Sequence, residues 1–151
     1  MINPRLLSVP VFAKTTLTTA VSTRNGTGAT LLYTVPATGA YDFAPPPAFS
    51  ATSGWVVESA TRSARAQGLR INRISAIAQG TSAEGVLLVF HGTDLIDQIN
   101  VAAVTVTATT LSAQAVLAYG EGLLLPPGAE IRVALTAISA ATTVTLEGLL
   151  G

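Results

Sequence analysis

Short apolar runs separated by turn-forming residues recur along this chain, and no run has the spacing of an amphipathic helix. Residues 69–77 alternate like a strand with two different faces, whereas 86–90 is apolar without interruption, as a buried central strand is. Glycine-containing segments at 80–85 and 91–94 supply the turns that follow these strands. Regularly spaced short strands without intervening helices predict an all-β fold, an antiparallel β-sandwich of jelly-roll type.

The same patterns predict the remaining strands. They lie at 15–23, 29–35, 96–104, 106–111, 115–125, 130–138 and 142–149, and the last two are expected to form an antiparallel pair. Asn25 to Gly28 and Pro126 to Gly128 are turn sequences, because Asn and Gly tolerate positive φ and proline interrupts a strand. At 151 residues the chain is long enough for one domain to bury a core without disulfides, which a chain lacking cysteine cannot form.

Two segments interrupt the strand pattern. Residues 1–14 are apolar but contain two prolines, which suit edges and extended segments, so we expect an extended N-terminal arm that reaches a neighbouring subunit. Residues 36–67 are a proline-rich insertion in a sandwich that spans 15–151, and long loops in compact domains often bind partners. The partner-binding residues expected in these segments are Leu6, Leu7, Val9, Val11, Phe12 and Trp55.

The chain is unusually poor in charge: 49% of its residues are apolar and 11% are charged, and its acids and bases cancel. An average soluble domain is roughly one-quarter charged. Because charge keeps monomers dissolved and near-zero net charge favours association, many faces are expected to meet other protein. Zero net charge gives no attraction to nucleic acid, and the uncharged run 98–120 alternates like a strand, so no membrane contact is expected either.

Sites for catalysis are hard to place on this sequence. His91 is the single histidine, so a Ser-His-Asp triad would have to use it with Asp94 or Asp97. The chain has no Gly-x-Ser-x-Gly nucleophile elbow, and polar residues are usual in a turn such as 91–94. Paired carboxylates of a glycosidase drawn from distant strands are left open, although aromatic residues for sugar stacking make up only 5% of the chain. We therefore expect no enzyme and no catalytic residue.

Metal and phosphate sites are weighed in the same way. Asp94 and Asp97, with Glu84 near them, offer fewer oxygens than the six to eight that calcium takes, so no metal or cofactor is expected. The only local cluster of cations comprises Arg62, Arg65, Arg70 and Arg73. Strand alternation places the last two on opposite faces, which argues against a phosphate-binding surface and favours a solvated rim or salt bridges.

Two blocks resemble a loose group of small β-sandwich proteins encoded among the structural genes of tailed bacteriophages. Residues 68–92, GLRINRISAIAQGTSAEGVLLVFHG, are similar to the group's pattern I-x-x-I-x-A-x-A-x-G-T-x-A-x-V-L-x-L-F, and 115–128 contains its L-x-L-P-P-G turn. The resemblance covers roughly 68–149. The chain departs from the group in the insertion 36–67 and in its end, 147–151, which lacks an acidic-aromatic finish.

This resemblance implies a component of the virion, assembled in the host cytoplasm. Such a protein is a capsid decoration protein, a fibre or spike base, or a tail-associated subunit, commonly a homotrimer that binds the major capsid protein or other virion subunits. We therefore predict a non-enzymatic structural virion protein that associates with itself. The alternative is a carbohydrate- or receptor-binding sandwich used in host attachment, which binds through its loops, with 36–67 forming the site.

Overall fold

The structure, a computed structural model, describes residues 9–37 and 68–150 in full and, between them, only the backbone of four short strands. The described residues form strands and no helix. The strands are β1 (Val9–Leu17), β2 (Thr30–Thr34), β3 (Asp42–Phe43), β4 (Ala48–Ser50), β5 (Gly54–Val56), β6 (Arg62–Ser63), β7 (Leu69–Ala78), β8 (Gly85–His91), β9 (Asp94–Val101), β10 (Gln114–Leu125), β11 (Glu130–Leu135) and β12 (Thr142–Leu150).

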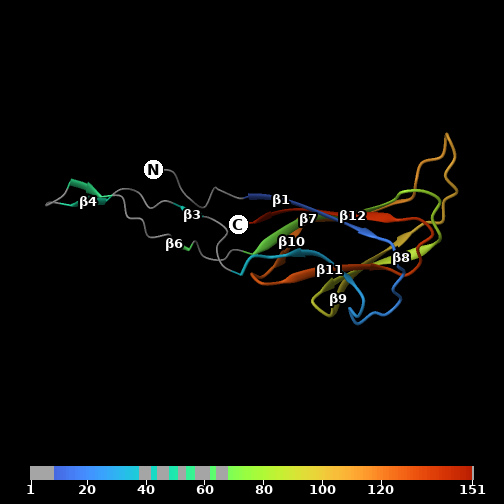
Figure 1. Cartoon of the computed structure of the whole chain (residues 1–151), viewed down its shortest axis with the longest axis horizontal. Helices are drawn as coiled ribbons and strands as arrows, with labels where there is room; N and C mark the ends of the chain where they lie inside the picture. The colour runs from blue at the N-terminus through green and yellow to red at the C-terminus, as the bar shows by residue number, and fades with distance from the viewer. Residues whose placement is uncertain are drawn as a thin grey trace.

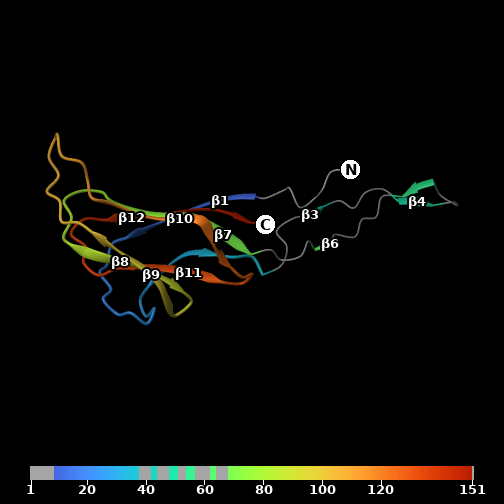
Figure 2. The ribbon, with the colours of Figure 1, turned by 180° about the vertical axis from the view of Figure 1, so that it is seen from behind.

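The eight longer strands form two antiparallel sheets that pack as a sandwich (Figures 1 and 2). Sheet A has the strand order β1-β12-β7-β10, and sheet B has the order β2-β11-β8-β9. Among these eight, the first strand pairs with the last, the second with the seventh, the third with the sixth and the fourth with the fifth. This nested pairing is the topology of a jelly roll, so the predicted fold class is confirmed.

The nested pairing also explains which sequence expectations are wrong. Of the links between consecutive long strands, only the turn between β8 and β9 joins neighbours in one sheet. The expected pair of 130–138 with 142–149 does not form, because β11 belongs to sheet B and β12 to sheet A. The expected turn at 25–28 does form, with positive φ at Gly26 and Gly28, and it lies in the link between the two sheets. The expected strand at 106–111 is a loop.

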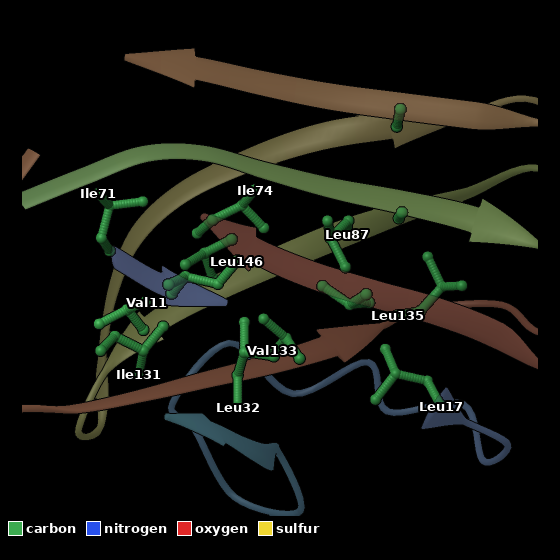
Figure 3. Close-up of a cluster of buried hydrophobic side chains, with 14 of the residues drawn as sticks. Val11, Leu17, Leu32, Ile71, Ile74, Leu87, Ile131, Val133, Leu135 and Leu146 are labelled. Atoms are coloured by element: carbon green, nitrogen blue, oxygen red, sulfur yellow. The ribbon is translucent and has the colours of Figure 1, made fainter. Parts of the chain in front are cut away.

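The core lies between the two sheets, where alternate residues of each strand meet (Figure 3). Both sheets contribute fully buried side chains, among them Ile71, Ile74 and Leu146 from sheet A and Leu87, Val89, Ile131 and Val133 from sheet B. Each buried Ile, Leu or Val of this kind stabilises the fold by about 1.5–3 kcal/mol relative to leaving it exposed. The sandwich is therefore held by apolar burial between its layers.

The outer face of sheet B carries a second, smaller cluster. Leu88 and Phe90 of β8 point away from the main core and are covered by residues of the link between β1 and β2, including Val21 and Ala29. The backbone N–H of Val21 donates to the carbonyl of Leu135 at 2.9 Å and holds this link on the sheet. The strand β8 is therefore buried on both faces, as its uninterrupted apolar sequence predicts.

A bulge in β7 changes which residues face outward from sheet A. On the neighbouring β12, Glu147 pairs with Arg73 and Gly148 pairs with Ile71, so Asn72 is the extra residue. Before the bulge the odd-numbered residues of β7 face the core, and after it the even-numbered ones do. Arg70 and Arg73 therefore share the outer face, and the expectation that they lie on opposite faces is wrong.

The second part of the predicted arm lies in a sheet. β1 pairs with β12 from Val9 to Leu17, so residues 9–14 are part of the edge strand of sheet A. Pro10 fits an edge position because it lacks the N–H that an inner strand would need. Residues 1–8 lie outside the described residues. Within 36–67, β3 pairs with β6 and β4 with β5, as two small antiparallel sheets separate from sheets A and B.

Candidate interaction surface

The outer face of sheet A is built from side chains that the strand register aligns in rows. Each row takes one outward-facing residue from β1, β12, β7 and β10, in that order. The rows are Pro10–Leu149–Arg70–Leu124, Phe12–Glu147–Arg73–Ala118, Lys14–Thr145–Ser75–Val116 and Thr16–Thr143–Ile77–Gln114. The sequence scatters these residues over more than a hundred positions, and the jelly-roll pairing collects them on one face.

Large apolar side chains gather on this face. Phe12 is 66% exposed and Leu124 is 65% exposed, and Ile77 and Val116 are also exposed. In the described ranges these are four of the eight exposed large hydrophobic residues. The outer face of sheet B differs, because the link between β1 and β2 covers its central apolar residues Leu88 and Phe90 and leaves Leu31 on the edge strand exposed. An uncovered sheet face with several large apolar side chains is typical of a protein contact.

An ion pair lies at the middle of the outer face of sheet A. Arg73 Nη2 is 2.7 Å from Glu147 Oε1, and the two residues belong to the two inner strands, β7 and β12. In the next row the hydroxyls of Ser75 and Thr145 are 2.6 Å apart and share a hydrogen bond. An exposed pair such as Arg73–Glu147 contributes only about 0–1 kcal/mol to folding. Its main physical effect is to fix a positive and a negative group side by side on the face.

Two further cations border this central pair. Lys14 lies on the edge strand β1, and Arg70 lies on β7 opposite Leu124 of β10. The side chain of Arg70 crosses above Gly122, where an added Cβ would approach its Cγ to 2.3 Å. Gly122 has φ 85° and belongs to the stretch between Ala118 and Leu123 in which the register of β10 shifts. This glycine therefore leaves the space in which the Arg70 side chain lies along the sheet.

A polar contact joins the two sheets along the side formed by β9 and β10. The hydroxyl of Tyr119 on β10 donates to Asp97 Oδ2 on β9 at 2.8 Å. Burial, together with the hydrogen bond and the negative charge of Asp97, raises the pKa of Tyr119 well above its usual value. The other oxygen of Asp97 accepts a hydrogen bond from the backbone N–H of Gln98 at 2.8 Å. Both oxygens of Asp97 are thus engaged in holding the fold.

The structure brings only some of the residues weighed for catalysis and metal binding together. His91 and Asp94 are register partners at the two ends of the turn from β8 to β9, and Gly92 in that turn has φ 62°. Glu84 is exposed and lies just before β8. Among the residues that the structure describes, no three His, Asp or Glu side chains lie close enough to hold a metal ion.

The predicted partner-binding residues lie in different parts of the molecule. Val11 packs in the core, whereas its neighbour Phe12 is on the outer face of sheet A and Val9 is partly exposed at the start of the strand. Leu6 and Leu7 lie outside the described residues, as does the Trp55 side chain. The side chains of Arg62 and Arg65 lie there too. Sequence reasoning missed Leu124, Ile77 and Glu147, whose common face depends on strand order and on the β7 bulge.

Comparison with known proteins does not identify a family for this chain. Neither the models of protein families nor the sequences of curated proteins match this chain. In the part of the chain that the structure describes, no helix is long and apolar enough to cross a membrane. The resemblance to phage sandwich proteins therefore depends on the motifs within 68–149 alone.

Proposed function

We propose that this chain is a structural subunit of a tailed-phage virion, which acts by associating with copies of itself and with other virion subunits. The observation that carries the proposal is the uncovered outer face of sheet A, with Phe12 and Leu124 about two-thirds exposed at 66% and 65%. The same face carries Lys14, Arg70 and the Arg73–Glu147 ion pair, so it combines exposed apolar area with a few fixed charges. Covering it with protein removes apolar area from water, the main driving force for association.

The architecture supports this proposal without deciding it. Jelly rolls occur in viral capsid domains and also in lectins, so the fold is shared by more than one function. The choice of a virion and its major capsid protein as partners rests on the resemblance of residues 68–149 to phage sandwich proteins. The capsid-decoration and fibre-base versions of the proposal use the same surface and differ only in the subunit that it meets.

Self-association is tested by measuring the mass of the full chain in solution. Light scattering after size exclusion and native mass spectrometry, over a dilution series, should show a multimer, and the resemblance favours a trimer. A chain that stays monomeric from micromolar to millimolar concentration contradicts the proposal. Varying the salt concentration adds a check, because apolar contacts persist in salt that screens exposed charges.

The predicted arm is tested with a truncation that the structure now defines. Deleting residues 1–8 leaves all of β1 in place, whereas deleting 1–14 would remove part of the edge strand. If the arm binds a neighbouring subunit, the chain without 1–8 keeps its melting temperature and loses mass in the native assembly. Unchanged assembly would show that the arm does not contribute.

A binding module for carbohydrate or receptor is a second candidate, favoured by the loop 102–113. This loop leaves the sandwich after β9 (Figure 1), and its exposed threonines are ordered by Thr107, whose hydroxyl oxygen accepts bonds from the N–H groups of Thr109 and Thr110 at 3.3 and 3.1 Å. Ordered hydroxyls on a protruding loop suit hydrogen bonding to a sugar. Saturable binding on a glycan array, lost on substituting this loop, would favour the module.

A further inference from the structure

We propose that two copies of this chain pack face to face through the outer face of sheet A, about a two-fold axis that runs along the strands between β7 and β12. This inference rests on the proposed function and deepens it by naming one contact surface and its two-fold symmetry. Such pairing gives an even number of copies, so the trimer that the resemblance favours would have to pair into six. The face is one of the two outer faces of the sandwich, and on the other, that of sheet B, the chain's own link between β1 and β2 covers the central apolar residues Leu88 and Phe90.

The symmetry fixes which strands meet. A two-fold axis along the strands places β12 of one copy on β7 of the other and β1 of one copy on β10 of the other. Each row then lies on the same row of the second copy, with its order reversed. Sheets that pack face to face keep their strands within about 30° of each other, so the rows nearest the centre stay in register.

The charges at the centre are complementary under this operation. Glu147 lies opposite Arg73 of the second copy, and Arg73 lies opposite Glu147 of the second copy. Two exposed ion pairs become a cluster of four alternating charges, which is attractive across the interface. A two-fold axis across the strands would place β12 on β12 instead, and the outer residues of that strand include no cation to meet Glu147.

Three of the surrounding pairs also agree in shape or polarity. Phe12, the largest side chain on the face, lies opposite Ala118 of the second copy, so a protruding ring meets a small residue. Pro10 lies opposite Leu124, which pairs two apolar groups. The hydroxyl of Thr145 lies opposite Ser75 in the third row. Large against small and polar against polar are the pairings that a self-complementary patch requires.

The two remaining cations are compatible with this packing. Lys14 is on the edge strand β1 and lies opposite Val116, and Arg70 lies opposite Leu149. Long cationic side chains can place their methylene groups on apolar surface while the charge reaches water at the rim. The net charge of zero on the whole chain adds no long-range repulsion between copies.

The decisive experiment uses two charge-reversal variants and their mixture. Arg73→Glu gives the face two central carboxylates, and Glu147→Arg gives it two central guanidinium groups, so each variant should repel its own copies. We expect each variant alone to pair about tenfold or more weakly than the wild type, because like charges face each other in the pair. An equimolar mixture should recover pairing as mixed pairs, identified by native mass spectrometry from the mass difference between the variants.

Neither variant contains the Arg73–Glu147 ion pair within its own chain. Recovered pairing in the mixture must therefore come from opposite charges that meet between copies. The matched control reverses the Arg132–Glu130 pair on sheet B, whose atoms are 2.9 Å apart and which is similarly exposed. Arg132→Glu and Glu130→Arg should leave pairing unchanged alone or mixed. Circular dichroism melts verify that each variant is folded, and Ala118→Trp, which fills the space facing Phe12, provides a second route to weaker pairing.

The outcomes separate this inference from the proposed function. If the wild type associates and the central reversals leave its mass and affinity unchanged, association uses another surface, and the pairing is wrong while the proposed function stands. The same conclusion follows if the assembly is an odd-numbered ring that never pairs, or if the face instead captures a different virion subunit. If the wild type is monomeric throughout, both proposals are wrong.

Discussion

Tyr119 and Asp97 join the two sheets of the jelly roll through a hydrogen bond of 2.8 Å between the tyrosine hydroxyl and the carboxylate. Tyr119 belongs to β10, the edge strand of sheet A, and Asp97 to β9, the edge strand of sheet B. The bond thus closes the side of the sandwich opposite β1 and β2. The strands β9 and β10 belong to different sheets and do not pair through their backbones, and this side-chain hydrogen bond connects them.

Removing the hydroxyl tests the strength of this connection. Tyr119→Phe should lower the free energy of unfolding by about 1–3 kcal/mol, because a partly buried carboxylate loses a charge-assisted hydrogen bond. Urea denaturation of wild type and variant gives the difference. The control is Asp94→Asn, which changes an exposed carboxylate three residues before Asp97. This variant should change stability by less than about 0.5 kcal/mol. Equal stability of Tyr119→Phe and wild type would show that the bond contributes nothing.

The raised pKa of Tyr119 predicts a loss of stability in alkali. Burial and the neighbouring carboxylate raise this pKa above the ordinary tyrosine value of 10.0 that the unfolded chain has. The native state therefore keeps a proton that the unfolded state loses, so stability is full below pH 10 and falls as the pH rises above it. The free energy of unfolding measured from pH 8 to 12 should decline more steeply for wild type than for Tyr119→Phe. Parallel curves would contradict the assignment.

Gly148 supplies a prediction about close backbone packing beside the β7 bulge. A Cβ at this position would lie 2.6 Å from the carbonyl oxygen of Arg70, which is a backbone atom and cannot swing away. Gly148→Ala should therefore cost about 1–3 kcal/mol of stability, the usual range for overpacking. Gly120 is the matched control, since an added Cβ there meets no atom within 4 Å. Thermal melts of the two variants should differ clearly, and similar melting temperatures would argue against a tight approach at Gly148.

Much of the fold follows from local patterns, and the part that does not follow depends on pairings distant in sequence. The alternation of β7 and the apolar run of β8 identify strands because one or two faces of each are buried. Whether β11 pairs with β12 or with β8 is decided by the nested order of the whole sandwich, which no local window contains. Local sequence therefore predicts the class of fold and most of the long strands, although 106–111 is a loop, and it does not predict the partner of each strand.

The candidate surface was only partly predictable for a related reason. The sequence predicts Phe12 as a contact residue, but its partners on the face come from strands more than fifty residues later. The alternation rule also fails at Asn72, where an extra residue reverses which side chains face outward. Nothing in the polar sequence around Asn72 marks the bulge. Arg70 and Arg73 could be placed on one face only once the register with β12 was known.

Two adjacent residues of β1 give opposite predictions and test the placement of the surface. Val11 is buried in the core at 9% exposure, so Val11→Ala should cost about 1–3 kcal/mol through lost burial and a cavity. Phe12 is exposed on the outer face of sheet A, so Phe12→Ser should leave stability within about 0.5 kcal/mol and should weaken self-association. Denaturation and native mass, measured on both variants, separate the two effects. If Phe12→Ser unfolds the chain or leaves association intact, Phe12 does not belong to a docking face.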